Sequence, residues 1–465
     1  MSAPFLWIFL PLILAGLLLP LRNRNVVVLV SCVFTLFLTL AAWLLPIDTA
    51  LTIGNWSFKL TSSFEILGRH LILAPADRSF LALIYGSSLF WFGATFSSGA
   101  SRRLIPFGLA ITALLVAALA VEPFLYAALI IEMAVLLSVP LLSTSGQKPG
   151  RGLIRFLIFQ TLAMPFILFS GWLLAGIEAN PGDLGLVQQA AILISLGFSF
   201  LLAVFPFYSW IPLLAEEASP IAVGFILWMF PTVTIFFGLG FLDHYTWLRD
   251  ASSLGIILTT VGILMIFSGG LLAAFQHHLG RIMGYAVIME TGYSLLAIIL
   301  GEKSGLGIFY LLFIPRILAM VLWAFSLTIL KEHYPTLALD NMKGLARIWP
   351  FATSGLVLAN LALVGMPMLA GFPTHQAIWE GLASRSLPAV FWVLMGNLGL
   401  FICVLRTVYT FAIVHEETQG GVRETILQRI LVVIGIVAIF LLGLFPQWAL
   451  PLWTRLPALF THLGQ

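Results

Sequence analysis

The chain has 465 residues, of which 61% are hydrophobic and only 9% are charged. Soluble proteins carry about 25% charged residues, so this composition predicts a polytopic membrane protein without a large water-soluble domain. The small net charge of +3 gives no support for nucleic-acid binding. Only two cysteines occur, both inside apolar runs, and there is no Gly-rich phosphate loop. We therefore expect no disulfide framework, no cysteine-bound metal and no cofactor.

Apolar stretches recur along the whole chain. A spanning helix needs about 20 apolar residues, and by this measure we expect an all-α polytopic membrane protein with about fourteen transmembrane helices. The first stretch lacks a preceding basic region and a small-residue cleavage site, so it is predicted to be a mature helix rather than a signal peptide. The predicted helices are 4–21, 26–45, 78–97, 104–121, 123–143, 152–176, 188–211, 220–242, 254–275, 282–300, 305–330, 349–383, 388–413 and 428–446.

The loops between these stretches predict an orientation. Short cytoplasmic loops collect Lys and Arg, and every second loop here is basic, with the acidic pair Glu216-Glu217 as the exception. This alternation places the N-terminus outside. A longer external segment around residues 48–59 is expected to form a hairpin. The tail, with Trp448, Trp453 and Arg455, is expected to lie at the membrane interface.

The seventh predicted helix is interrupted. Residues 198–220 read FSFLLAVFPFYSWIPLLAEEASP, and each internal proline removes a backbone donor and clashes with the preceding turn. At membrane depth such a break is tolerated only where protein or a water-filled cavity satisfies the freed groups, and broken helices often form transport sites. A second break interrupts the twelfth helix. The elements of the two breaks are Pro206, Trp210, Pro212 and Pro220, and then Pro367, Gly371 and Pro373.

An embedded glutamate precedes each break. Glu132 in the fifth helix and Glu290 in the tenth each lie roughly 75 residues before a break, which indicates two five-helix repeats of inverted topology with discontinuous helices 7 and 12. We expect four regions. They are the N-terminal helices 1–103, a first repeat 104–242, a second repeat 254–413, and a last helix with its interfacial tail, 428–465.

Charged residues in mid-membrane are the candidates for chemistry, because each costs about 2.5–3.5 kcal/mol on insertion scales. Glu132 could change protonation state as a partner moves, or it could be a protonated glutamate that bridges two helices. His375 titrates near neutral pH and could carry a proton or cap a half-helix. Arg316 cannot lose its proton, so it can anchor a carboxylate or shape the potential. Glu380 is expected near the outer end of its helix.

Three further polar residues have an expected placement. Arg406 is expected to pair with another group or to snorkel. His277 and His278 are expected to form a solvated loop end and not a metal site.

Three motifs resemble those of the antiporter-like membrane subunits of respiratory complex I, the chain M/N-like subunits of NADH:quinone oxidoreductase. FPFYSWIPLLAEEASP resembles the family's Pro-x-His-x-Trp-Leu-Pro … Pro-Thr-Pro signature. QHHLGRIMGYAVIMETGY and GMPMLAGFPTH resemble its Gln-x-Asp-Leu-Lys-Arg-Ile-Leu-Ala-Tyr-Ser … Gly-Tyr and Gly-x-Pro … Gly-Phe-x-x-Lys elements. The resemblance covers residues 104–406. The family also includes membrane subunits of hydrogenases and of multisubunit cation/proton antiporters.

The resemblance assigns roles, and this chain departs from several of them. Glu132 matches the family's helix-five glutamate, but the lysine expected before the first break is Leu201. Other positions of the family's charged axis carry different residues. Thr232 stands for a second lysine, Ile226 for a histidine, Arg316 for the helix-eleven lysine, His375 for the helix-twelve lysine, His278 for a loop aspartate and Gly280 for a loop lysine.

The resemblance implies a divergent subunit of a complex I-type NADH:quinone oxidoreductase in a bacterial plasma membrane. It would take part in impaired or rewired redox-coupled proton translocation, with a non-conducting first repeat and titratable groups left in the second. It would have no redox site of its own, and its partners would be other membrane subunits, the lipid bilayer and protons. Two alternatives stay open: a component of a non-respiratory cation/proton antiporter or inorganic-carbon uptake system, or a structural subunit that does not pump.

Overall fold

Almost all of the chain is built from long helices. The computed structural model describes residues 2–53, 56–66, 68–99, 101–143, 148–179, 183–300, 305–413, 422–448, 460 and 462–463. The predicted Trp453 and Arg455 of the interfacial tail lie outside these residues. The main helices are α1 (Leu10–Leu18), α2 (Arg24–Leu44), α3 (Arg78–Ala94), α4 (Leu104–Ala120), α5 (Ala127–Leu142), α6 (Arg151–Ala179), α7 (Leu184–Leu201), α8 (Trp210–Glu217), α9 (Pro220–His244), α11 (Ser252–Ala274), α12 (Leu279–Ile299), α13 (Gly305–Leu311), α14 (Phe313–Lys331), α16 (Pro350–Val364), α17 (Phe372–Ala383), α18 (Leu387–Ala412) and α19 (Ile426–Leu444).

Each of the fourteen predicted stretches contains a helix, so the all-α, multi-pass character of the chain is confirmed. Within the described residues, ten helices are long and apolar enough to cross a membrane. Three further apolar helices, Phe5–Leu18, Leu104–Ala120 and Pro350–Val364, are shorter. The number of fourteen crossings therefore stays a prediction.

The predicted hairpin between the second and third helices is present. Strands β1 (Ala50–Ile53) and β2 (Trp56–Lys59) pair antiparallel. A second small sheet, β3 (Ser63–Ile66), β4 (Arg69–Ile72) and β5 (Val121–Glu122), was not expected. Its strands are too short to show an alternating pattern, and β5 begins where the apolar run of α4 ends.

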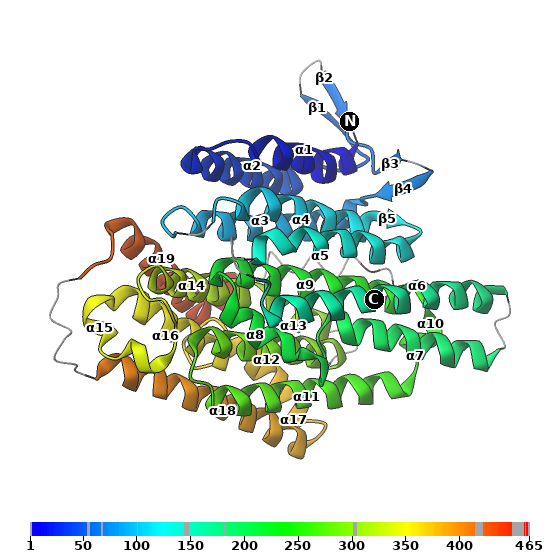
Figure 1. The fold of residues 1–465 in the computed structure, drawn as a ribbon. Helices are drawn as coiled ribbons and strands as arrows, with labels where there is room; N and C mark the ends of the chain where they lie inside the picture. Colours follow the sequence, from blue (N-terminus) through cyan, green and yellow to red (C-terminus); the bar gives the residue numbers. More distant parts are fainter. Residues whose placement is uncertain are drawn as a thin grey trace.

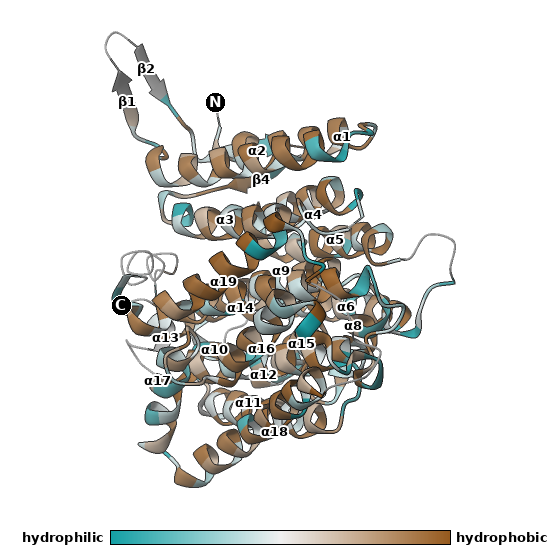
Figure 2. Ribbon diagram, turned by 90° about the vertical axis from the view of Figure 1, so that its left-hand side faces the viewer, coloured by the Kyte–Doolittle hydropathy of each residue, from teal (hydrophilic) through white to brown (hydrophobic). Residues whose placement is uncertain are grey.

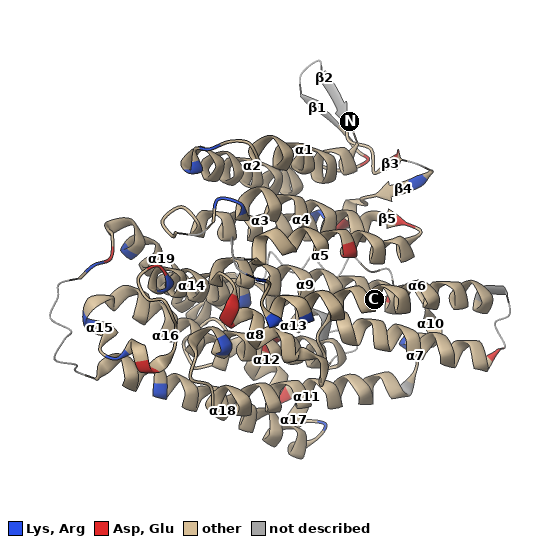
Figure 3. Cartoon of the chain, viewed as in Figure 1, with Lys and Arg blue, Asp and Glu red and all other residues tan. Residues whose placement is uncertain are grey.

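The helices lie in layers (Figure 1). Helices α1 and α2 form an outer layer over α3, α4 and α5, and the remaining helices pack below them. The central helices are enclosed by the others: 94% of the apolar span of α9 and 83% of that of α12 are buried, against 17% for α19. Outer helices such as α19 are apolar along their length (Figure 2), as expected of surfaces that face lipid or another membrane subunit. Charged residues gather at helix ends and turns (Figure 3).

Both predicted helix breaks are present. Helix α7 ends at Leu201, and after a short irregular segment and one 3₁₀ turn the chain continues as α8. Ala203 in this segment has φ +49°. The second break separates α16 from α17, and Gly365 ends α16 with φ +80°, a conformation that glycine adopts without strain. The division of the chain into inverted repeats stays a prediction.

The prolines of the two breaks occupy positions that helix chemistry favours. Pro220 lies in the first turn of α9 and Pro373 in the first turn of α17, where no intrahelical donor is lost. Pro206 and Pro367 lie in the breaks themselves, and Pro212 lies in the first turn of α8. One interruption was missed: the eleventh predicted helix is divided at Leu312 into α13 and α14.

Candidate functional site

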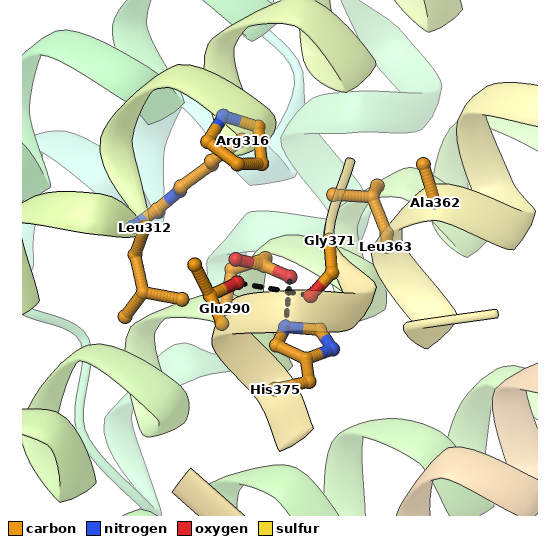
Figure 4. A pocket seen from close by; sticks show the side chains of 9 residues that line it. Glu290, Leu312, Arg316, Ala362, Leu363, Gly371 and His375 are labelled. Carbon is orange, nitrogen blue, oxygen red and sulfur yellow. Dashed lines mark hydrogen bonds and ion pairs between the residues drawn. The ribbon is translucent and has the colours of Figure 1, made fainter. Parts of the chain in front are cut away.

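The second break brings three ionisable side chains together in the centre of the molecule (Figure 4). Glu290 comes from α12, Arg316 from α14 and His375 from the first turns of α17. Their residues are 3%, 2% and 1% exposed, respectively. Because a buried charge is tolerated only with a partner or a cavity, the contacts of each group decide what the site can do.

Glu290 and His375 are in direct contact. The His375 Nε2 atom lies 3.4 Å from the Glu290 Oε1 atom. The imidazole stacks on the ring of Tyr293, with centroids 4.0 Å apart and planes 12° from parallel. The Tyr293 hydroxyl in turn accepts hydrogen bonds from Trp379 Nε1 at 3.1 Å and Asn397 Nδ2 at 2.6 Å. The imidazole therefore has a fixed orientation, and the pair can share one proton between its two members.

The other imidazole nitrogen faces the break. A Cβ atom built on Gly365 would lie 2.5 Å from His375 Nδ1, so the ring occupies the space that a side chain would need. Among the described residues, Nδ1 has no hydrogen-bond partner. The break thus provides both the room for the imidazole and an unsatisfied proton-exchanging atom.

Arg316 lies close to the pair without touching it. Its Nη1 donates to Ser294 Oγ at 3.3 Å, while Nε and Nη2 have no partner in the described part of the chain. A cavity of about 10 Å³ separates the groups, which is close to the space of one water molecule. Its lining consists of Glu290, Leu312, Pro315, Arg316, Ala362, Leu363, Gly371, Thr374 and His375. A water here could connect the guanidinium to the Glu290–His375 pair.

The first break has a different character. Leu201 is 4% exposed, and Thr232 is buried with its hydroxyl donating to the Trp228 carbonyl at 2.6 Å. Neither residue can carry a proton. Gln160 of α6 lies against this break instead: its Nε2 donates to the carbonyls of Phe200 and Leu201 at 3.4 and 3.2 Å. The amide adds a donor at the end of the broken helix, where the Phe200 carbonyl also accepts from the Ala203 N–H at 3.2 Å.

Gln160 was missed from the sequence. A lone amide in an apolar helix was the only available signal, and its partner carbonyls lie some forty residues further along the chain. Trp210, at the start of α8, is 3% exposed and packs on Phe156 with ring centroids 5.0 Å apart. Its role is to fill the core next to the break.

Glu132 lies apart from the central cluster, on α5. The residue is half-buried, and its Oε1 atom accepts a hydrogen bond from Thr161 Oγ1 at 2.7 Å. Its Oε2 atom is enclosed and has no partner among the described residues. The structure therefore gives Glu132 a bridge to α6, and leaves one carboxylate oxygen unsatisfied.

The remaining predicted residues do not join the cluster. Glu380 is exposed and accepts a hydrogen bond from Gln376 of its own helix at 2.8 Å. Arg406 donates to the Gln276 carbonyl, in agreement with the expected pairing. The described residues contain no group of three metal-ligating side chains.

His278 requires a correction. His277 is exposed, as expected, but His278 is half-buried at the start of α12, where its Nδ1 accepts a hydrogen bond from the Gly280 N–H at 3.1 Å. Burial lowers the pKa of His278, nearby Glu216 opposes this, and Lys331 and Arg281 add to it. The residue is a helix cap and not part of a solvated loop end.

The acidic pair that departed from the loop-charge pattern ties α8 to its neighbours. Glu216 forms an ion pair with Arg281 of α12 at 2.6 Å, and Glu217 accepts a hydrogen bond from the Gly152 N–H at 2.8 Å. Lys331 of α14 donates to the Ala218 carbonyl at 2.7 Å. The contacts with Arg281 and Lys331 join the half-helix after the first break to helices of the second predicted repeat, and the contact with Gly152 joins it to α6 of the first.

Comparison with known proteins identifies relatives of the chain. The family model described as NADH:quinone oxidoreductase/Mrp antiporter, transmembrane, matches residues 108–402. NADH-quinone oxidoreductase subunit N 2 of Acidobacterium capsulatum is 28% identical in an alignment 333 residues long, which covers 65% of this chain and 66% of that protein. The chain spans between about half and two thirds of the length of the curated relatives it matches.

Solved structures show the same fold at low sequence identity. A chain of respiratory complex I from Thermus thermophilus with bound NADH superposes with a TM-score of 0.76 at 20% identity, over 99% of this chain and 100% of that one. A chain of the Mrp complex from Dietzia sp. superposes with a TM-score of 0.80 at 16% identity, over 99% and 97% of the two chains.

Proposed function

Because this chain belongs to the NADH:quinone oxidoreductase/Mrp antiporter transmembrane family, we propose that it is an antiporter-like membrane subunit of a complex I-type NADH:quinone oxidoreductase. Electron transfer would take place in partner subunits, and this subunit would take part in proton translocation. The observation that carries the proposal is the Glu290–His375 pair, buried beside Arg316 at the second break.

The proton relay of this proposal uses groups of the second repeat, residues 254–413. His375 exchanges a proton with Glu290 through their direct contact. The Nδ1 atom of His375 and the cavity beside Arg316 offer the two sides from which a proton reaches or leaves the pair. Tyr293 holds the imidazole in place. Arg316 keeps its positive charge throughout, and its field favours a negative charge on the pair.

The first repeat, residues 104–242, has no relay in this proposal. Leu201 and Thr232 hold no titratable group, and the amide of Gln160 occupies the backbone carbonyls at the break. These observations also favour a second candidate, a structural subunit that fills its place in the assembly without pumping. The two candidates differ only in whether the Glu290–His375 pair moves protons.

The proposed partners are other membrane subunits. The structural neighbours support this, because they are chains of larger assemblies, respiratory complex I and an Mrp complex. We further propose that the N-terminus lies outside a bacterial plasma membrane, from the alternation of basic loops.

The assembly is tested by purifying the affinity-tagged chain from its native membranes in a mild detergent. We expect a large complex that reduces quinone with NADH and that contains further quinone-oxidoreductase subunits on mass spectrometry. Recovery of the chain with antiporter subunits only, together with NADH-independent cation/proton exchange in vesicles, would instead support the antiporter alternative. A chain recovered alone would overturn the proposal.

A further inference from the structure

A pocket at one end of the first helices lies apart from the site around Glu290. It has a volume of about 220 Å³ and is lined by Leu19 after α1, by Arg102, Arg103, Pro106 and Phe107 around the start of α4, and by Pro140 near the end of α5. Arg102 and Arg103 are both exposed there. The pocket therefore combines two guanidinium groups with an apolar wall.

The first four helices carry no acidic residue of their own at this end, where Glu332, just after α14, approaches Gly99 and Arg24. Residues 1–47 and 78–121, which contain α1 to α4, include no Asp or Glu. Basic residues mark the α1–α2 and α3–α4 turns (Figure 3). Arg102 donates to the Leu21 carbonyl at 3.0 Å, whereas the Arg103 guanidinium makes no hydrogen bond or ion pair to any residue that the structure describes. Arg24 is different, because it donates to the carbonyls of Thr95 and Ser98 and lies near Glu332.

Apolar side chains continue from the pocket along α5. On α1 the pocket residue Leu19 is itself exposed, whereas Ile13 and Leu17 lie on another face, because Leu17 precedes Leu19 by only two residues. Met133 and Leu136 of α5 are 55% and 56% exposed, and Leu136 precedes Pro140 by one turn. In a helix such spacing places the side chains on one face. An apolar face of α5 therefore leads away from the two guanidinium groups.

We propose that this pocket binds an anionic phospholipid. Its phosphate would lie on Arg102 and Arg103, because the planar guanidinium matches phosphate oxygens with paired N–H donors. Its acyl chains would lie along the Met133–Leu136 face of α5, beside Leu19. Basic pockets between transmembrane helices near the membrane surface recognise anionic headgroups in this way. The proposal does not depend on the function proposed for the second break.

Native mass spectrometry of the full chain, purified in mild detergent, tests the site. The protein is offered equal amounts of phosphatidylglycerol and phosphatidylethanolamine. We expect wild type to retain phosphatidylglycerol at least about fivefold more than phosphatidylethanolamine, since each arginine near the surface contributes about this factor. Arg103→Gln, which leaves the Arg102 contact intact, should weaken the preference, and Arg102→Gln with Arg103→Gln should abolish it.

The matched control is Lys343→Gln with Arg347→Gln, which removes two exposed basic residues from the segment between α14 and α16. This variant should retain the wild-type preference. Equal retention of both lipids by wild type, an unchanged preference in the Arg102/Arg103 variant, or an equal loss in the control would each overturn the proposal. So would a membrane subunit that copurifies on the α1–α5 face and excludes both lipids.

Discussion

The imidazole of His375 shows how single residues shape the candidate site. It occupies the space left by Gly365, stacks on Tyr293 and contacts Glu290 through one nitrogen. The sequence indicated that Glu290, Arg316 and His375 are embedded, because charged residues in apolar helices stand out. It could not indicate that Tyr293 orients the ring or that Gly365 makes room for it, because both contacts require the packing of three helices.

Gly365→Ala tests the importance of this space. The new methyl group would collide with His375 Nδ1, and the left-handed backbone at φ +80° disfavours alanine. We expect a loss of about 1–3 kcal/mol in the free energy of unfolding, measured by denaturation of the purified protein in detergent. The control Gly93→Ala, in α3, adds a methyl group to open space. Equal stability of the two variants would contradict this account of the break.

Asp77 gives a prediction about pH. Burial raises the pKa of Asp77 to about 6, and the hydrogen bond from the Ala74 N–H opposes the rise. Because this pKa lies above the value of about 3.9 in the unfolded state, the folded state binds more protons than the unfolded state between about pH 4 and pH 6. The extra proton therefore stabilises the folded state. This stabilisation is complete below about pH 4 and is lost as the pH rises through about 6.

The variant Asp77→Asn removes this dependence. Compared with wild type, we expect its melting temperature to be raised more at pH 7.5 than at pH 4.5, as read by thermal unfolding in detergent. Asp340→Asn, at an exposed aspartate, provides the control. A difference between Asp77→Asn and wild type that is the same at both pH values would show that the carboxyl group does not titrate in this range.

At the scale of elements, the two broken helices have different partners. The prolines and glycines predicted both breaks because they cluster there, whereas the single prolines Pro140, Pro165 and Pro231 lie inside continuous helices. The partners come from distant segments and were not predictable: Gln160 at the first break, and the ion pair of Glu216 with Arg281 after it. The divided helix at Leu312 was missed although Pro315 marks it, because this proline has no N–H to bond to the Leu311 carbonyl. The sheet of β3 to β5 was missed because its strands are only two to four residues long.

Gln160→Leu tests whether the amide holds the first break together. The substitution leaves the carbonyls of Phe200 and Leu201 without this donor in a buried position, so we expect a loss of about 1–3 kcal/mol in the free energy of unfolding. Gln189→Leu, at an exposed position of α7, is the matched control and should change little. A Gln160→Leu protein as stable as its control would mean that other groups satisfy the break.

At the scale of the whole molecule, composition and span length were sufficient to predict a helical multi-pass membrane protein. Motif order was sufficient to predict the family, which residues 108–402 match. The prediction of which side of the membrane each turn faces depends on loop charge alone. Ten spans are long and apolar within the described residues, so the fourteen crossings require a direct test.

Cysteine labelling tests the predicted topology. In a background without Cys32 and Cys403, single cysteines replace Glu65, Ser101, Asp250 and Lys343. A membrane-impermeant thiol reagent added to intact cells should label Glu65→Cys and Asp250→Cys only. The same reagent added to inside-out vesicles should label Ser101→Cys and Lys343→Cys only. Labelling of Ser101→Cys and Lys343→Cys from opposite sides would mean that an odd number of helices crosses between them.

The central claim is that the Glu290–His375 pair moves protons while the first repeat does not. Its most direct test is the number of protons translocated per electron in inside-out vesicles, from the NADH-driven pH gradient and the rate of quinone reduction. We expect His375→Ala and Glu290→Gln to lower this ratio to a similar extent, and Glu132→Gln to leave it unchanged. A wild-type ratio in His375→Ala, or a loss confined to Glu132→Gln, would contradict the account.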